Sequence, residues 1–155
     1  MTLANMLRRK LSETPAADER HELAVADEAS GWSVYLSAER HDKWTTVAWE
    51  MTVRRIQASG KLADWAARVA EKTSGLMETL RVVEIDAAHD RALIRSAAPS
   101  DTDSALAYYE VVLQGTKSAL VRRYEGSHTS GKRTQVPFVL TNEVLAKFAG
   151  DIASE

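Results

Sequence analysis

The sequence predicts an α+β domain in which one antiparallel β-sheet is packed with amphipathic helices. Apolar and polar residues alternate in several stretches joined by short turns, as in neighbouring antiparallel strands, and such turns leave no room for parallel crossovers. Other stretches, near both ends and in the middle of the chain, carry apolar residues at helical spacing. The expected order is α-β-β-β-α-β-β-β-β-β-α, in a single domain over residues 1–155.

The composition is that of an ordinary globular protein and excludes several functions. The chain has 45% hydrophobic and 27% charged residues, and its net charge of −2 gives no electrostatic reason to expect nucleic acid as a partner. It has no cysteine, which excludes disulfides, thiolate metal sites and a cysteine nucleophile. No apolar run follows Arg8-Arg9-Lys10, and no stretch approaches the roughly 20 apolar residues that span a bilayer. We therefore expect a cytoplasmic protein with no membrane partner.

The first helix is expected over residues 3–11, where apolar side chains share one face and Pro15 closes the segment. An acidic stretch over 13–28 follows, with one short strand at 23–26. The next helix is expected over 62–76, because its apolar residues recur at helical spacing after Ser59-Gly60.

Between these helices, the alternation predicts a hairpin and its register. The segments 32–39 and 47–53 are the expected strands, joined by a turn that pairs Arg40 with Lys43. The apolar residues of both strands then lie on one face, as a half-buried sheet requires. The predicted pairs are Leu36 with Val47, Val34 with Trp49, and Trp32 with Met51.

Two further hairpins are expected before the last strand. Residues 80–86 and 92–97 pair around 87–90, with Ile85 opposite Ile94 and Glu84 opposite Arg95. A type II′ turn at Gly115 joins the next two strands and places Val111 opposite Leu120.

The chain is expected to end with a strand over 134–140 and a helix. Pro137 cannot donate a ladder hydrogen bond, so this strand should lie at an edge or be bonded on one side only. Thr141 is the expected N-cap of the final helix, which has an apolar stripe from Val144 to Ile152.

No group of residues predicts catalysis, a metal site or a cofactor. Residues 126–134 match a phosphate-binding loop except at Arg133, but they lead into a strand instead of a helix, so we interpret them as a strand connection. The histidines His21, His41, His89 and His128 are far apart in sequence, and none has the spacing of a metal-binding pair.

Tyr35 and Trp44 are the candidate partner-binding residues. Both belong to the other face of the first hairpin, among polar side chains. If the helices cover the face that contains Trp49, these two rings are partly exposed, and exposed aromatic side chains are enriched where partners dock.

The order of elements, the size and the pI near 6.1 resemble the small chaperones of type III secretion and the chaperone-like domains that share their fold. The resemblance is one of topology, without a motif, and residues 105–124 and 134–140 add strands to that pattern. A PsbP-like αβα sandwich fits the strand count comparably. The corresponding segments are 3–11, 23–53, 62–76, 80–97 and 144–152.

Three hypotheses follow for the function. The first is a non-enzymatic, chaperone-like module that captures an extended segment of a partner polypeptide along an apolar groove or sheet edge, with Tyr35 and Trp44 as contacts. The second is a small-molecule-binding protein or small hydrolase with a site between sheet and helices, where His89 lies beside Asp86 or Asp90. The third is a structural or accessory subunit that forms a homodimer.

Overall fold

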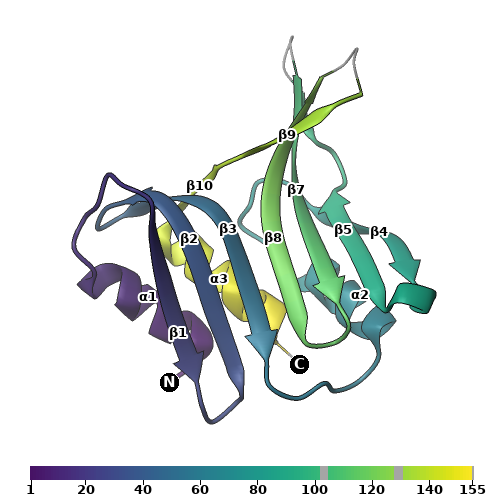
Figure 1. Ribbon diagram of the computed structural model, residues 1–155, viewed down its shortest axis with the longest axis horizontal. Coiled ribbons are helices and arrows are strands. Elements are labelled where there is room, and N and C mark those ends of the chain that lie inside the picture. The colour runs from purple at the N-terminus through teal and green to yellow at the C-terminus, as the bar shows by residue number, and fades with distance from the viewer. Residues whose placement is uncertain (102–104, 128–130, 155) are drawn as a thin grey trace.

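The computed structural model describes residues 1–101, 105–127 and 131–154 and confirms the predicted α+β architecture. The elements are α1 (Leu3–Glu13), β1 (His21–Asp27), β2 (Trp32–His41), β3 (Thr45–Arg55), α2 (Leu62–Lys72), β4 (Leu80–Asp86), η1 (Ala87–His89), β5 (Arg91–Ser96), β6 (Ser100–Asp101), β7 (Ala105–Gln114), β8 (Ser118–Ser127), β9 (Arg133–Val136), β10 (Phe138–Thr141) and α3 (Asn142–Ala153). Within these residues, ten antiparallel strands form one sheet in the order β1-β2-β3-β8-β7-β5-β4, while β10 pairs with β3, β6 with β7 and β9 with β8 (Figure 1).

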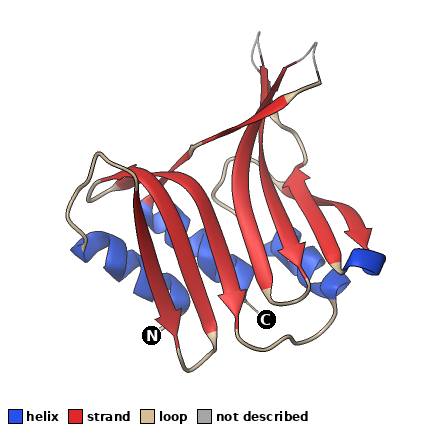
Figure 2. Ribbon diagram, viewed as in Figure 1, coloured by secondary structure: helices blue, strands red, loops and turns tan. Residues whose placement is uncertain are grey.

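All three α-helices lie on one side of the sheet (Figure 2). Helix α1 packs on β1 and β2, α3 packs on β3 and β10, and α2 packs on β4 and β5. The described residues place no helix on the opposite side, which we call the helix-free face. None of the described helices is long and apolar enough to cross a membrane.

Trp65 joins three parts of the core. Its ring on α2 is 1% exposed and packs against Trp32 of β2, with 5.8 Å between the ring centroids. Its indole Nε1 donates a hydrogen bond of 2.9 Å to the backbone oxygen of Ile152 on α3. A single side chain therefore connects α2, the sheet and the last helix.

The start of α3 is fixed by two adjacent residues. The hydroxyl of Thr141 accepts a hydrogen bond from the Val144 N–H at 3.2 Å, which confirms the predicted N-cap. Asn142 is buried, and its Oδ1 accepts from the hydroxyl of Thr46 at 2.7 Å. Its Nδ2 donates to the backbone oxygens of Asp42 and Lys43 at 3.0 and 3.1 Å, so α3 is held on the β2–β3 turn.

The first hairpin has the predicted strands but not the predicted register. The turn is longer than expected, because the carboxylate of Asp42 accepts the backbone N–H groups of Trp44 and Thr45 at 2.7 and 2.9 Å. These two N–H groups also lower the pKa of Asp42 below its ordinary value. The observed pairs are Leu36 with Met51, Val34 with Val53, and Trp32 with Arg55. Because the register moves by an even number of residues, Met51 and Val53 still face the core.

Trp49 does not join the core, contrary to the prediction that pairs it with Val34. Ser37 pairs with Glu50 whereas Ala38 pairs with Ala48, so Trp49 is the extra residue of a β-bulge. The bulge interrupts the alternation of side chains between the two faces of the sheet, so the Trp49 side chain does not point into the core. Trp49 is half-buried, and its ring lies 4.8 Å from the guanidinium of Arg20, outside the core.

The second hairpin also differs from its predicted register. Ile85 pairs with Ala92 and Ile94 pairs with Val82, because the strands close around η1 and a register shift follows Val82 in β4. Glu84 consequently lies opposite Leu93 and not Arg95.

The third hairpin is displaced by one residue. Gln114 pairs with Ser118 around a three-residue loop that begins at Gly115, whose φ of +56° favours glycine. Val111 therefore faces Val121 instead of Leu120. A slip of one residue exchanges the two faces of a strand, so Leu120 and its alternate neighbours lie on the helix-free face.

Pro137 divides the last strand into β9 and β10, and each half is bonded on one side only, as predicted. β3 and β8 pair with each other only over residues 51–54 of β3, and beyond that point β10 takes over as the neighbour of β3. The chain around Pro137 therefore crosses from β8 to β3 (Figure 1). The side-chain amide nitrogen of Gln135 donates to the backbone oxygen of Trp49 at 3.0 Å. The bulge therefore lies where β3 separates from β8 and begins to pair with β10, a point that we call the fork.

The Tyr109→Phe variant should lose less free energy of unfolding than the wild type when the pH is raised above about 10. Burial raises the pKa of the Tyr109 phenol, the Arg123 guanidinium 4.5 Å from its ring lowers it in part, and Glu78 raises it. In the unfolded chain a tyrosine titrates near about pH 10, so its contribution to stability is present below that pH and is lost as the pH rises above it. Urea unfolding across this range should show a steeper loss for the wild type than for Y109F. Equal slopes for Y109F and the wild type would refute the assignment.

Candidate functional site

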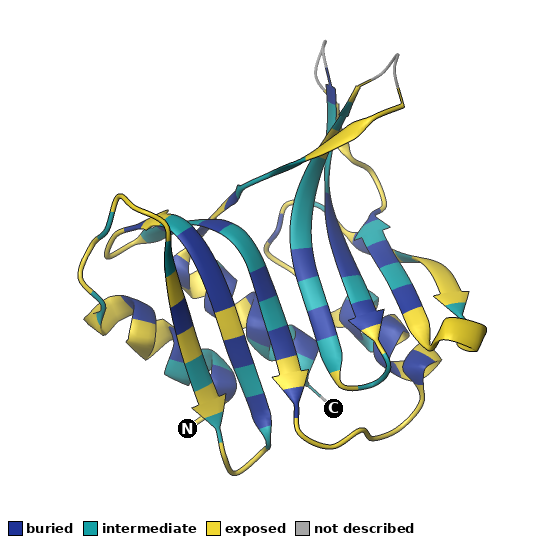
Figure 3. Cartoon of the chain, viewed as in Figure 1, coloured by how far each residue is buried: buried dark blue, intermediate teal, exposed yellow. Residues whose placement is uncertain are grey.

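A continuous row of side chains crosses the helix-free face from β2 to β4. Cross-strand pairing gives its members in order: Tyr35, Thr52, Leu120, Val112, Leu93 and Glu84. Tyr35 is 48% exposed and the next four are half-buried, and we call these five residues the apolar row. The alternation of buried and partly exposed positions along the central strands is visible in Figure 3. Because strands lie about 4.8 Å apart, the row from Tyr35 to Glu84 is about 24 Å long.

A ladder of charges runs beside the apolar row. Nε of Arg122 donates to Glu50 at 2.9 Å, and Nε of Arg95 donates to Glu110 at 2.9 Å. Arg133 also donates to Glu110, at 2.6 Å, and the side chain of Glu110 is only 6% exposed. The hydrogen bond that Arg133 donates to Glu110 raises the pKa of Arg133 more than burial lowers it. The pKa of Arg122 is also raised, in part by its hydrogen bond to Glu50, which favours the charged form of both guanidinium groups.

Aromatic rings hold several of the same arginines. The rings of Tyr108 and Tyr124 lie 6.1 Å apart on β7 and β8. The guanidinium of Arg133 lies 3.8 Å from the Tyr124 centroid, and that of Arg95 lies 5.5 Å from the Tyr108 centroid. Contacts of this kind help to fix a guanidinium in place.

The two rows that flank the apolar row carry more arginines than acids. This excess of positive charge contrasts with the net charge of −2 of the whole chain. The charged side chains of the two rows are Arg54, Arg81, Arg91, Arg95 and Arg122 against Glu50, Asp86 and Glu110.

A hollow lies at each end of the apolar row. The hollow near β2 has a volume of about 280 Å³ and is lined by Tyr35 and Arg54 among others. The hollow near β4 has a volume of about 250 Å³, and Leu93, Arg91 and Glu84 line it. Each end therefore combines an apolar side chain of the row with an arginine.

The structure exposes both predicted partner-binding residues but does not bring them together. Tyr35 is the first member of the apolar row. Trp44 is 71% exposed in the turn after β2, where its N–H is bonded to Asp42. The six residue-to-residue steps along β2 from Tyr35 to His41 alone span about 20 Å.

The three residues of the hydrolase hypothesis lie on an outer turn. His89 Nδ1 is 2.8 Å from Asp86 Oδ2, but the His89 side chain is 79% exposed. Asp90 follows with a φ of +51°, and its carboxylate lies next to Gly115. Asp86 lines the hollow near β4 whereas His89 does not, so the imidazole does not face an enclosed space.

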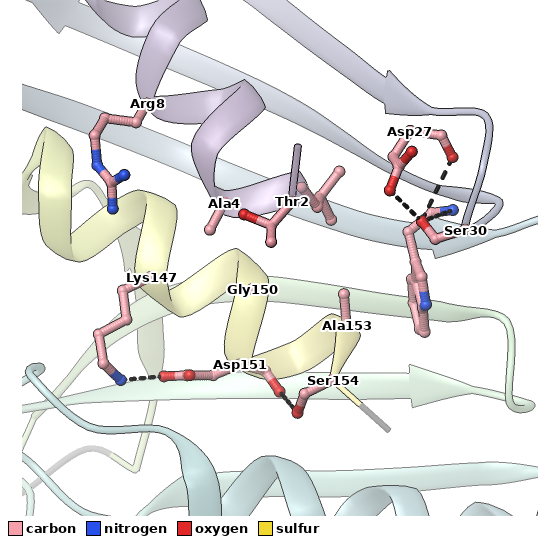
Figure 4. Close-up of a pocket in the computed structure, with 12 residues that line it drawn as sticks. Thr2, Ala4, Arg8, Asp27, Ser30, Lys147, Gly150, Asp151, Ala153 and Ser154 are labelled. Carbon is pink, nitrogen blue, oxygen red and sulfur yellow. Dashed lines mark hydrogen bonds and ion pairs between the residues drawn. The ribbon is translucent and has the colours of Figure 1, made fainter.

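A further hollow of about 460 Å³ lies between α1, α3 and the β1–β2 turn (Figure 4). Its charged groups are bonded to their neighbours: Lys147 to Asp151 at 2.7 Å, Asp27 to the hydroxyl of Ser30 at 2.7 Å, and Arg8 to the side-chain oxygen of Asn5 at 2.5 Å. Pairing of this kind leaves few groups free to bind a ligand or to transfer a proton.

Sequence spacing did not reveal that His21 and His41 meet. His21 Nε2 lies 3.1 Å from His41 Nδ1, because β1 and β2 are antiparallel and the start of one lies beside the end of the other. A predicted pairing of β1 with β2 would have been the signal. Among the described residues, no group of three or more His, Asp or Glu could hold a metal ion.

The segment that matches a phosphate-binding loop lies only partly within the described residues, which exclude 128–130. Gly126 belongs to β8 and Arg133 to β9, and these two residues pair with each other. A strand thus follows the segment, as predicted.

Comparisons with protein-family models, with curated proteins and with solved structures gave no match for this chain.

Proposed function

We propose that this protein is a non-enzymatic, chaperone-like module that binds a segment of a partner polypeptide across its helix-free face. The observation that carries the proposal is the apolar row, which continues over five strands without a covering helix. The topological resemblance to type III secretion chaperones supports the same function, and we propose a cytoplasmic location because a chain without cysteine suits a reducing compartment.

The partner segment should be extended and should carry both apolar and acidic side chains. The apolar row together with Glu84 is about 24 Å long, which corresponds to about seven extended residues. Apolar side chains would contact Leu120, Val112 and Leu93 and enter the two hollows. Acidic side chains would lie over the flanking arginines, because these rows carry an excess of positive charge.

Leu120→Arg should abolish most of this binding. Leu120 is at the centre of the row, and a charged side chain there would interrupt the apolar contact. We expect the dissociation constant to rise by about 10- to 30-fold, the effect of losing a central contact residue. The measurement is a selection of seven-residue peptides by the wild-type protein, followed by titration of the enriched peptides against both proteins.

The exposed Trp44→Ala variant is the matched control and should retain wild-type affinity, because Trp44 lies outside the row. Far-UV circular dichroism should show that L120R is folded. Enriched peptides that bind L120R as well as the wild type would exclude the row as the binding site. Enrichment of basic peptides, or tighter binding of single-stranded nucleic acid, would contradict the proposed partner.

A further inference from the structure

His21 and His41 form a chain of three hydrogen bonds where β1 begins and β2 ends. The inner contact joins His21 Nε2 to His41 Nδ1 at 3.1 Å, and the ring centroids are 5.1 Å apart. The other nitrogen of each ring contacts a backbone carbonyl oxygen. His21 Nδ1 lies 2.7 Å from the oxygen of Glu19, and His41 Nε2 lies 3.1 Å from the oxygen of Thr14.

The number of N–H protons on the two imidazole rings follows from the carbonyl oxygens at the two ends of this series of hydrogen bonds. A carbonyl oxygen only accepts hydrogen bonds, so the outer nitrogen of each ring must carry a proton. Two neutral imidazoles have one N–H each, and both would be used at the ends. The inner nitrogens would then face each other with lone pairs alone. One additional proton supplies the missing donor, whereas a second would set two N–H groups against each other.

We therefore propose that the folded protein holds one shared proton between His21 and His41, and that this pair is a pH-sensitive fastening of the α1–β1 connection. The pair attaches residues 14–19 to the end of β2 through the oxygens of Thr14 and Glu19. Ala17 and His41 also exchange two backbone hydrogen bonds of 3.0 Å. This inference does not depend on the proposed function.

The surroundings favour a proton over a metal ion. His41 is 4% exposed and His21 is half-buried. Asp18, Arg40 and Asp42 line a hollow together with His41. Glu19, Arg20 and Glu22 flank His21 in the sequence, and the guanidinium of Arg20 lies 4.8 Å from the Trp49 ring. No third ligand completes a metal-binding group within the described residues, and two imidazoles alone fall short of the usual four ligands of zinc.

The pH dependence has a maximum. Histidines in an unfolded chain titrate near about pH 6.5. Above that pH the unfolded chain holds neither proton while the folded pair holds one, so stability falls as the pH rises. Below that pH the unfolded chain holds two and the folded pair one, so stability falls as the pH drops. The contribution of the pair to stability is therefore largest at about pH 6.5 and decreases at higher and at lower pH.

The His21→Gln variant distinguishes the effect of the shared proton from the effect of side-chain packing. The glutamine amide can donate to His41 Nδ1 at every pH without titrating. The experiment is urea unfolding of the wild type and H21Q at a series of pH values, with ¹⁵N NMR of histidine-labelled protein. We expect the wild type to take up as much as one more proton on folding than H21Q above about pH 7, so that its folding constant changes by up to tenfold per pH unit relative to the variant.

The NMR spectra should show three N–H groups on the two rings near about pH 6.5. His89→Asn is the matched control, because His89 is exposed and distant in sequence, and it should retain the wild-type difference from H21Q. Two neutral rings and equal pH slopes for the wild type and H21Q would overturn the proposal. A rise in Tm with micromolar Zn²⁺ that H21Q lacks, without proton uptake on folding, would also overturn it and assign the pair to a metal.

Discussion

Trp65→Ala is expected to lower the free energy of unfolding by about 3–5 kcal/mol, the range for truncating a large buried aromatic side chain. The ring fills the space between α2 and the sheet, packs on Trp32 and lies 5.6 Å from the guanidinium of Arg55. Its loss also removes the hydrogen bond to the oxygen of Ile152. The cavity and the unpaired carbonyl act in the same direction, which places the expected loss at the upper end of that range. Urea unfolding followed by circular dichroism measures it.

Trp44→Ala is the control for this prediction. It removes the same side chain from a position that is 71% exposed, so its effect should stay within about 0.5 kcal/mol. Trp65→Phe keeps the apolar volume in part and loses the N–H donor, and should lie between the two. A loss below about 1 kcal/mol for W65A would show that the three elements do not depend on this ring.

Asn142→Leu is expected to cost about 2–4 kcal/mol. The amide of Asn142 serves three partners: the hydroxyl of Thr46 and the backbone oxygens of Asp42 and Lys43. A leucine has a similar volume but leaves all three without this partner at a buried position. Each unmade hydrogen bond in such a place costs about 1 kcal/mol or more. Thermal and urea unfolding would both report the change.

Thr46→Val is the matched control, because it removes one of these three hydrogen bonds and should cost about 1 kcal/mol. If N142L were no less stable than T46V, water would have to satisfy the two carbonyls, and the amide would not be what holds α3 to the turn. Asn142→Asp retains the acceptor but loses both donors, so it should resemble N142L more than the wild type.

The fold class followed from the sequence because alternation and helical spacing are local signals. The stripe of Leu62, Trp65, Ala66 and Val69 faces the core as expected, and Thr141 caps α3. The registers did not follow, because each depends on the geometry of a turn or a bulge. The carboxylate of Asp42 lengthens the first turn, and Trp49 is an extra residue in β3.

The candidate site was missed for the same reason. A slip of one residue at Gly115 decides whether Leu120 faces the helices or lies on the helix-free face. Tyr35 was identified because its hairpin has an even register shift, which preserves the two faces. The meeting of His21 with His41 depends on which strands are neighbours, and spacing along the chain does not contain that information.

The fork at Pro137 divides the sheet into two blocks of strands. Directly paired residues join β3 to β8 only from Met51 to Arg54, so one block is formed by β1, β2, β3 and β10 and the other by β4, β5, β6, β7, β8 and β9. The short β9–β10 segment connects the two blocks, because β9 pairs with β8 and β10 pairs with β3. On the helical side of the sheet, the hydrogen bond of Trp65 connects α2 to α3. After a cut in the backbone beside Pro137, the two halves of the sheet would still be joined by the chain that runs from β3 through α2 to β4, by the short β3–β8 ladder, by the Arg122–Glu50 and Gln135–Trp49 hydrogen bonds, and by the contacts of the helical layer.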